Sequence, residues 1–149
     1  MKSQEKGFVF EKFIVEMLKD LGKKNIQHNQ QKKKKRIFGE DLRFQIDITY
    51  GVFRKHYVEC KYKEKNNVGL EDVAKFRSVL EIMEIPYNRG LMVTNKYYTE
   101  RAKYYAKKNH IKLYNRNDLM SWCWKRKKFV EKIIGTKKFD LEKRILGGV

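Results

Sequence analysis

The sequence FQIDITYGVFRKHYVECKYK, residues 44–63, predicts two short strands joined by a turn at Gly51. Side chains alternate between the two faces of a strand. One face of this hairpin is therefore expected to carry apolar side chains, namely those of Ile46, Ile48, Val58, Cys60 and Tyr62. The opposite face collects three charged side chains, those of Asp47, Glu59 and Lys61. The hairpin thus predicts a sheet with a charged cluster on strand interiors.

Such a cluster is costly unless its groups are paired or bind a metal. One interpretation is a Mg²⁺ site in which Asp47 and Glu59 provide carboxylate oxygens and Cys60 its backbone carbonyl. Lys61 would then orient or deprotonate a metal-bound water and neutralise charge that develops on a phosphate. The other interpretation is a structural ion-pair cluster on a half-exposed sheet. These residues alone leave both interpretations open.

The spacing Asp47, hairpin, Glu59-Cys60-Lys61 resembles the D…(D/E)-x-K signature of the PD-(D/E)XK nuclease superfamily. Ile46 stands where the signature has proline, a departure common in that superfamily. The resemblance implies hydrolysis of phosphodiester bonds with Mg²⁺, for which Mn²⁺ would substitute.

A helix is expected over residues 3–21, because apolar residues recur there at three- and four-residue spacing and Gly22 provides a stop. Glu11 falls at the edge of the apolar stripe. One interpretation is an acid that borders the core with its carboxylate in solvent. The stretch GFVFEKFIVEMLKDLG, however, resembles the corresponding helix of Mrr-like restriction endonucleases and archaeal Holliday junction resolvases. That resemblance implies that Glu11 assists at the metal site.

Residues 23–40 show little periodicity apart from a possible short strand around residues 25–31. They contain a run of five cations that we expect in an exposed loop or hairpin tip: Lys32, Lys33, Lys34, Lys35 and Arg36. The run is either a solvated surface or, beside a nuclease site, a contact to the DNA backbone. Glu40 and Asp41 are also acids, but Asp47 is preferred for the site because it alone lies in an alternating strand pattern.

The second half of the chain predicts a helix at about 70–84, a strand at 90–94, a helix at 99–108 and a strand at 111–114. This order resembles the second half of the Mrr-like catalytic domain, so the resemblance covers roughly residues 7–119. Mrr-like enzymes often carry a Gln-x-x-x-Tyr pair on the first of these helices. Here Lys75 or Arg77 would have to replace it as a phosphate contact.

A last helix is expected over residues 117–134, capped by Asn117 and ended by Gly135. Trp122 and Trp124 precede the basic run at 125–128 and would either stack on unpaired bases or occupy the core and a subunit contact. We expect residues 1–119 to form the catalytic domain and residues 120–149 a basic helix and tail packed on it.

Composition indicates a polyanionic partner. The 149 residues suit one domain, and 36 Lys and Arg against 18 Asp and Glu give a net charge of +18. This excess favours nucleic acid first and an anionic membrane second. We expect a cytoplasmic protein, because no apolar run has the length of a membrane span and the amino terminus lacks a signal-peptide core. The two cysteines, Cys60 and Cys123, suggest neither a disulfide framework nor a structural zinc site.

The sequence therefore predicts an α/β fold of the restriction-endonuclease-like kind, with a mixed central sheet flanked by helices and an appended C-terminal helix. The predicted function is that of an Mrr-like, Mg²⁺-dependent DNA endonuclease. Two alternatives remain, a structure-specific nuclease such as a Holliday junction resolvase and a non-catalytic DNA-binding protein. The intact set of Asp47, Glu59 and Lys61 argues against the latter, because two acids weaken simple DNA binding. A homodimer is expected, since it supplies the two sites needed to cut both strands.

Overall fold

The computed structural model describes residues 2–28, 32–37 and 40–133, and it describes side chains except at residues 29–43 and from 126 onward. Its helices and strands follow one another in the order α1 (Ser3–Asp20), β1 (Gln27–His28), β2 (Lys32–Ile37), β3 (Glu40–Gln45), β4 (Ile48–Tyr50), β5 (His56–Lys61), α2 (Leu70–Ile82), β6 (Gly90–Thr94), α3 (Glu100–Lys108), β7 (Lys112–Tyr114) and α4 (Arg116–Ile133). A short 3₁₀ turn, Tyr87–Arg89, leads into β6.

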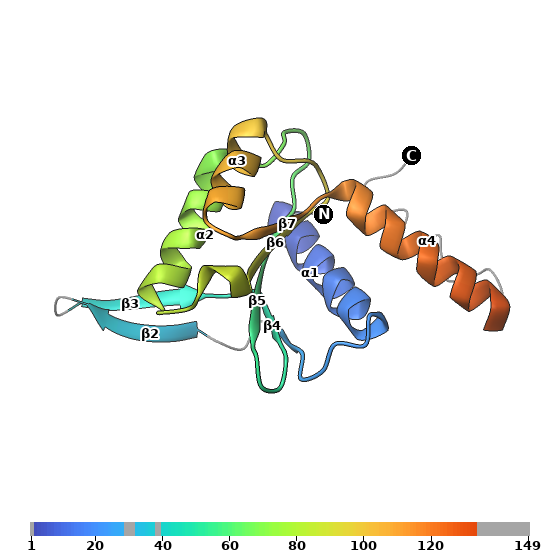
Figure 1. The fold of residues 1–149 in the computed structure, drawn as a ribbon, viewed down its shortest axis with the longest axis horizontal. Helices are drawn as coiled ribbons and strands as arrows, with labels where there is room; N and C mark the ends of the chain where they lie inside the picture. The colour runs from blue at the N-terminus through green and yellow to red at the C-terminus, as the bar shows by residue number, and fades with distance from the viewer. Residues whose placement is uncertain (1, 29–31, 38–39, 134–149) are drawn as a thin grey trace.

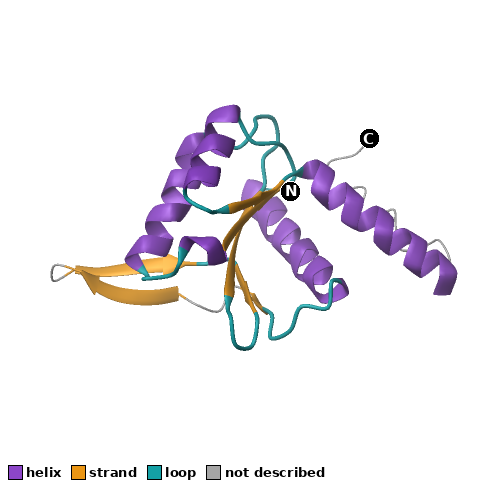
Figure 2. Ribbon diagram, viewed as in Figure 1, coloured by secondary structure: helices purple, strands orange, loops and turns teal. Residues whose placement is uncertain are grey.

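Five strands form a mixed sheet in the order β1-β4-β5-β6-β7. Strands β1, β4 and β5 pair antiparallel, whereas β5, β6 and β7 are parallel. Helix α1 covers one face of the sheet and helices α2 and α3 cover the other, as Figure 1 shows. Helix α4 leaves the end of β7 on the side of α1 (Figure 2). The predicted mixed sheet flanked by helices is confirmed.

Each face of the sheet has its own apolar core. On one face, Phe10 and Ile14 of α1 pack with Ile48 and Val58 of the sheet. The core on the other face is formed by residues of α2, α3, β6 and the chain around them, among them Val73, Phe76, Leu80, Met92, Ala102 and Ala106. A Cβ atom at Gly90 would lie only 2.5 Å from Leu80 Cδ1, so glycine lets α2 approach the sheet closely.

The hairpin β4–β5 confirms the predicted turn. Gly51 has a φ angle of +109°, and a Cβ atom there would collide with the backbone carbonyl of Arg54. Ile46, however, does not share a face with Ile48 as predicted, because it packs in the core under α2 and α3. The reason is that β3 ends at Gln45 and β4 begins at Ile48. The chain bends at Asp47 between them, which breaks the alternation.

The run of five cations, expected in an exposed loop or at a hairpin tip, forms neither but is the first strand of a hairpin. Lys32 to Arg36 lie in strand β2, which pairs antiparallel with β3 in a two-stranded ribbon. Figure 1 shows this ribbon projecting from the body of the molecule on the side away from α4. The strand itself was not predicted, because a ribbon outside the main sheet can pair its backbone without an apolar pattern. Glu40 and Asp41 therefore lie in strand β3, whereas Asp47 lies at the bend after it, so the strand pattern was the wrong reason for preferring Asp47.

Helix α4 begins one residue earlier than predicted, and its cap is Asn115 rather than Asn117. Asn115 Oδ1 accepts hydrogen bonds from the backbone N–H groups of Asn117 and Asp118, at 2.8 and 3.2 Å. Asp118 Oδ2 in turn accepts from the N–H of Asn115 at 2.8 Å, which completes a capping box. The predicted stop at Gly135 lies outside the described residues. None of the helices in the described part of the chain is long and apolar enough to cross a membrane.

Candidate active site

Asp47 lies at the bend between β3 and β4, beside strand β5. Its Oδ2 atom accepts a hydrogen bond from the backbone N–H of Cys60 at 2.8 Å. The register that pairs Ile48 with Val58 brings Asp47 next to Glu59. Burial, followed by the charge of Glu59, raises the pKa of Asp47 from 3.8 to about 7. The bend thus places two carboxylates in electrostatic contact at the edge of the core.

Glu59 and Lys61 follow each other on the same face of β5. Lys61 Nζ lies 3.1 Å from Glu59 Oε1, and both side chains are largely buried. Burial raises the pKa of Glu59, against the opposing effect of Lys61. Burial lowers the pKa of Lys61, but Glu59, Asp72 and Asp47 outweigh it and the pKa is raised. Lys61 is therefore an ammonium ion at neutral pH.

Glu11 reaches the same region from helix α1. Its side chain is 16% exposed, and its Oε2 atom lies 2.8 Å from Nε2 of His28 in β1. The charge of Glu11 contributes to the raised pKa of both Asp47 and Glu59, so the three acids lie within electrostatic range. His28 pairs with Ile48 across β1 and β4, one residue from Asp47.

The structure adds Asp72 and Asn95 to the residues expected from the sequence. Asp72, in the first turn of α2, lies 3.1 Å from Lys63 Nζ and 4.0 Å from Lys61 Nζ. Asn95 is buried directly after β6, and its side-chain amide bonds both the N–H and the carbonyl of Lys63, each at 2.8 Å. Both residues fix the end of β5 that carries Lys61. An amide just after an apolar strand was the only sequence signal for Asn95, and none pointed to Asp72 or His28.

Lys75 and Arg77 have different environments on α2. Lys75 is exposed, and its charge lowers the pKa of Glu59, so it lies near the carboxylates. The Arg77 guanidinium donates to Asn109 Oδ1 at 2.7 Å and lies 4.8 Å from the centroid of the Tyr87 ring. These contacts tie α2 to the end of α3. Of the basic run in β2, only the backbone is described.

The donor set fits a hard divalent cation. Asp47 and Glu59 are buried acids with raised pKa values, and a cation between them would relieve both burial and mutual repulsion. Mg²⁺ is commonly held by one or two carboxylates and keeps several waters. Within the described residues, no group of three or more His, Cys, Asp and Glu side chains is arranged to hold a metal ion. The chain would therefore contribute two carboxylates, and water most of the remaining ligands.

Comparisons with known proteins identify the family and the fold of the chain. Residues 3–123 match the family Mrr_cat, described as restriction endonuclease. The structure is similar to that of AF1548, a protein of unknown function, with a TM-score of 0.68 and 17% identity over 94% of this chain and 77% of that one. It is also similar to Can2 from Sulfobacillus thermosulfidooxidans in complex with cyclic tetra-adenylate, with a TM-score of 0.53 and 20% identity over 78% of this chain.

A further similar structure is VC1899 from Vibrio cholerae, with a TM-score of 0.50 and 14% identity over 80% of this chain. The aligned part spans only 36% of Can2 and 32% of VC1899. At these identities the three structures show the fold alone. No curated protein sequence matches the chain.

Proposed function

This chain belongs to the Mrr_cat family of restriction endonucleases, and from that premise we propose that it hydrolyses phosphodiester bonds of DNA with Mg²⁺, for which Mn²⁺ would substitute. The resemblance seen in the sequence is thereby confirmed at the level of family and fold. The observation that carries the proposal is the proximity of the Asp47 and Glu59 carboxylates beside the Lys61 ammonium. In the described part of the chain, Lys61 pairs with Glu59, and no cation lies at ion-pair distance from Asp47. A structural ion-pair cluster therefore does not explain the buried Asp47 carboxylate.

Asp47 and Glu59 would hold the cation, and the backbone carbonyl of Cys60 is the further ligand that we propose. When bound, the cation would polarise a phosphoryl oxygen and make water more acidic. The hydrogen bond from the Cys60 N–H holds one carboxylate oxygen of Asp47 in place, at 2.8 Å. This contact limits the rotation of the carboxylate, so the donor set is organised before any ligand arrives.

Lys61 would orient the attacking water and stabilise negative charge that develops on the phosphate. Its raised pKa favours these roles over proton abstraction, because a general base must be neutral. The ion pair with Glu59 and the more distant Asp72 position the ammonium. Asn95 fixes the backbone two residues beyond it.

Glu11 would assist as an outer ligand of the metal or its water. Its Oε2 atom lies 2.8 Å from Nε2 of His28, a contact that would orient the carboxylate toward Asp47 and Glu59. We propose that His28 positions Glu11 rather than binding the metal itself.

DNA would be held by the ribbon formed from β2 and β3 and by Lys75 next to the carboxylates. A two-stranded ribbon is narrow enough to enter the major groove of DNA. The five consecutive cations Lys32, Lys33, Lys34, Lys35 and Arg36 would neutralise phosphates on its walls. We favour Lys75 over Arg77, because Arg77 already bonds Asn109 and covers Tyr87. A homodimer would supply two sites for cutting both strands, and a reducing cytoplasm suits the two free cysteines.

Cleavage assays test the proposal directly. The purified chain would be incubated with labelled linear, nicked, single-stranded and four-way DNA, with Mg²⁺, with Mn²⁺ and with EDTA. We expect cleavage with either metal, none with EDTA and none by Glu59→Gln, while Glu81→Gln on the exposed side of α2 stays active. Preference for the four-way DNA would favour a junction resolvase. Binding without cleavage of any substrate would contradict the proposal.

A further inference from the structure

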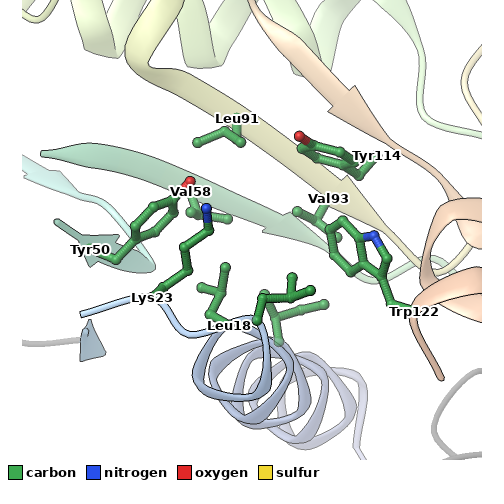
Figure 3. A pocket seen from close by; sticks show the side chains of 10 residues that line it. Leu18, Lys23, Tyr50, Val58, Leu91, Val93, Tyr114 and Trp122 are labelled. Carbon is green, nitrogen blue, oxygen red and sulfur yellow. The ribbon is translucent and has the colours of Figure 1, made fainter. Parts of the chain in front are cut away.

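A cavity of about 180 Å³ lies between α1, the sheet and the start of α4. Its floor is aliphatic, and Figure 3 shows Leu18, Val58, Leu91 and Val93 around it. Tyr50 forms one side, and Tyr114 and Trp122 form the other. The rings of Tyr114 and Trp122 lie 5.0 Å apart and are tilted by 50°. The cavity is smaller than the roughly 300–1,000 Å³ of pockets for drug-sized ligands, so it suits one flat ring system.

The surroundings of the cavity are cationic. Lys23 lines it and lies 5.4 Å from the centroid of the Tyr50 ring. Lys112 is paired in the sheet with Leu91, a residue of the cavity floor. His56 stacks on Tyr50 at 4.9 Å, and its pKa is lowered by burial and by the charges of Lys112 and Lys23. Neither ammonium forms an ion pair with a residue in the described part of the chain. Their charge would complement an anionic group at the mouth.

This cavity is distinct from the carboxylate site. Val58 faces α1 and the cavity, whereas the next residue, Glu59, faces α2 together with Lys61. Ile14 and Leu18 of α1 and Leu21 directly after it line the cavity, and all three lie beyond Glu11 along the chain. The cavity therefore lies on the other face of the sheet.

We propose that this cavity binds one unpaired nucleobase, with the attached phosphate held by Lys23 and Lys112, and this proposal rests on the nucleic-acid substrate proposed above. Aromatic side chains stack on bases of any sequence. Tyr114 and Trp122 supply such surfaces, whereas Tyr50, which already stacks on His56 and lies beneath Lys23, closes the opposite side of the cavity. An uncharged apolar ligand would provide no anionic group for the two ammonium groups. A base with its phosphate satisfies both the apolar floor and the cationic mouth.

The test compares two duplexes of equal length in EDTA, one fully paired and one with a single unpaired 2-aminopurine. Leu21→Trp fills the mouth from an exposed position, and Val52→Trp places the same bulk on the exposed β4–β5 turn as a control. Lys23→Gln removes the cation of the cavity, with Lys107→Gln on α3 as the matched control. A parallel titration with dAMP asks whether a free nucleotide binds as well.

We expect the parent chain to bind the bulged duplex about tenfold more tightly than the paired one, the order expected for stacking of one base. Leu21→Trp should abolish this difference, and Lys23→Gln should reduce it, while both control variants retain it. Competition by dAMP would show that the site takes a base from either source, and its absence would restrict the site to bases in a polynucleotide. Either result supports the proposal.

Equal affinity of the parent chain for the two duplexes would overturn the proposal, as would a preference that survives Leu21→Trp. If the preference is missing and Leu21→Trp converts a dimer to a monomer in sedimentation, the cavity is a contact surface between two copies of the chain. Cleavage plays no part in this measurement. If the parent chain cleaves DNA with Mg²⁺ but shows no preference for the bulged duplex, only the base-binding role of the cavity is rejected. If it prefers the bulged duplex but does not cleave DNA, only the proposed catalysis is rejected.

Discussion

The backbone N–H of Cys60 donates a hydrogen bond of 2.8 Å to Asp47 Oδ2, which joins the bend before β4 to the strand that carries Glu59 and Lys61. An asparagine at position 47 can still accept this bond through its amide oxygen but carries no charge. Charge and geometry at the site can therefore be separated experimentally.

Asp47→Asn should abolish cleavage while DNA binding persists or strengthens, because the change deletes a negative charge that faces the phosphates. Cleavage and filter binding of the same duplex would measure both effects. Glu59→Gln should likewise abolish cleavage and retain DNA binding. Full cleavage by Asp47→Asn would reject the assignment of this carboxylate.

Asp47→Asn should also alter the pH dependence of stability in metal-free buffer. The folded-state pKa of about 7 lies above the ordinary 3.8, so ionisation of Asp47 opposes folding. The parent should lose stability relative to the variant as pH rises from about 4 to 7, by on the order of a few kcal/mol, since one pKa unit corresponds to about 1.4 kcal/mol. Thermal melts at pH 5 and pH 8 test this. A difference in Tm between parent and variant that is the same at both pH values would contradict the raised pKa of Asp47. Added Mg²⁺ should raise the Tm of the parent at pH 8 but not that of the variant.

Lys61→Ala should lower the cleavage rate by about a hundredfold or more, the usual loss for a group that stabilises transition-state charge. Lys63→Ala is the matched control. It removes a partly exposed ion pair with Asp72, at 3.1 Å, and should lower the free energy of unfolding by only about 0.2–1 kcal/mol. Single-turnover rates at saturating DNA would compare them. Similar cleavage rates for the two variants would show that the loss in Lys61→Ala comes from a disturbed end of β5 and not from the missing ammonium.

Glu11→Gln should reduce activity steeply with little change in thermal stability, because the carboxylate would act on the metal or its water. His28 gives a finer test, since it lies 2.8 Å from Glu11. His28→Ala should cost less than Glu11→Gln, and His28→Gln should restore part of the rate, because an amide can again donate to Glu11. If both His28 variants cleave like the parent, His28 has no positioning role.

How far the sequence anticipated this structure depends on the range of the interactions. Helix α1, strand β6 and helix α3 follow local patterns of apolar spacing and stop residues, and their predicted bounds agree to within about two residues. The juxtaposition of Asp47 and Glu59 was also accessible, because a hairpin joins them. His28 and Asp72 were not, because the pairing of β1 with β4 and the docking of α2 are tertiary contacts. The ribbon was missed because its strand β2 is almost entirely cationic, and Ile46 was misplaced because the bend at Asp47 interrupts the alternation.

The ribbon supports a last prediction about how DNA is held. Each phosphate that a lysine neutralises releases counterions, so log affinity falls with log salt by about 0.9 per contact. Replacing Lys33, Lys34 and Lys35 by glutamine should therefore flatten the salt dependence by roughly one to three units. The loss of affinity should be similar for all sequences, because phosphate contacts do not read bases. Fluorescence anisotropy over a range of salt concentrations measures the slope.

The matched control replaces three exposed lysines of α3, Lys103, Lys107 and Lys108, by glutamine and makes the same change in net charge. It should leave the slope close to that of the parent. Turnover of the ribbon variant at low salt and saturating DNA should survive, because Asp47 and Glu59 are not part of the ribbon. Both lie after it in the sequence, and Glu59 lies in the five-stranded sheet. An unchanged slope for the ribbon variant would make its lysines a solvated surface. The basic residues from position 125 onward would then be the next candidates for the DNA contact.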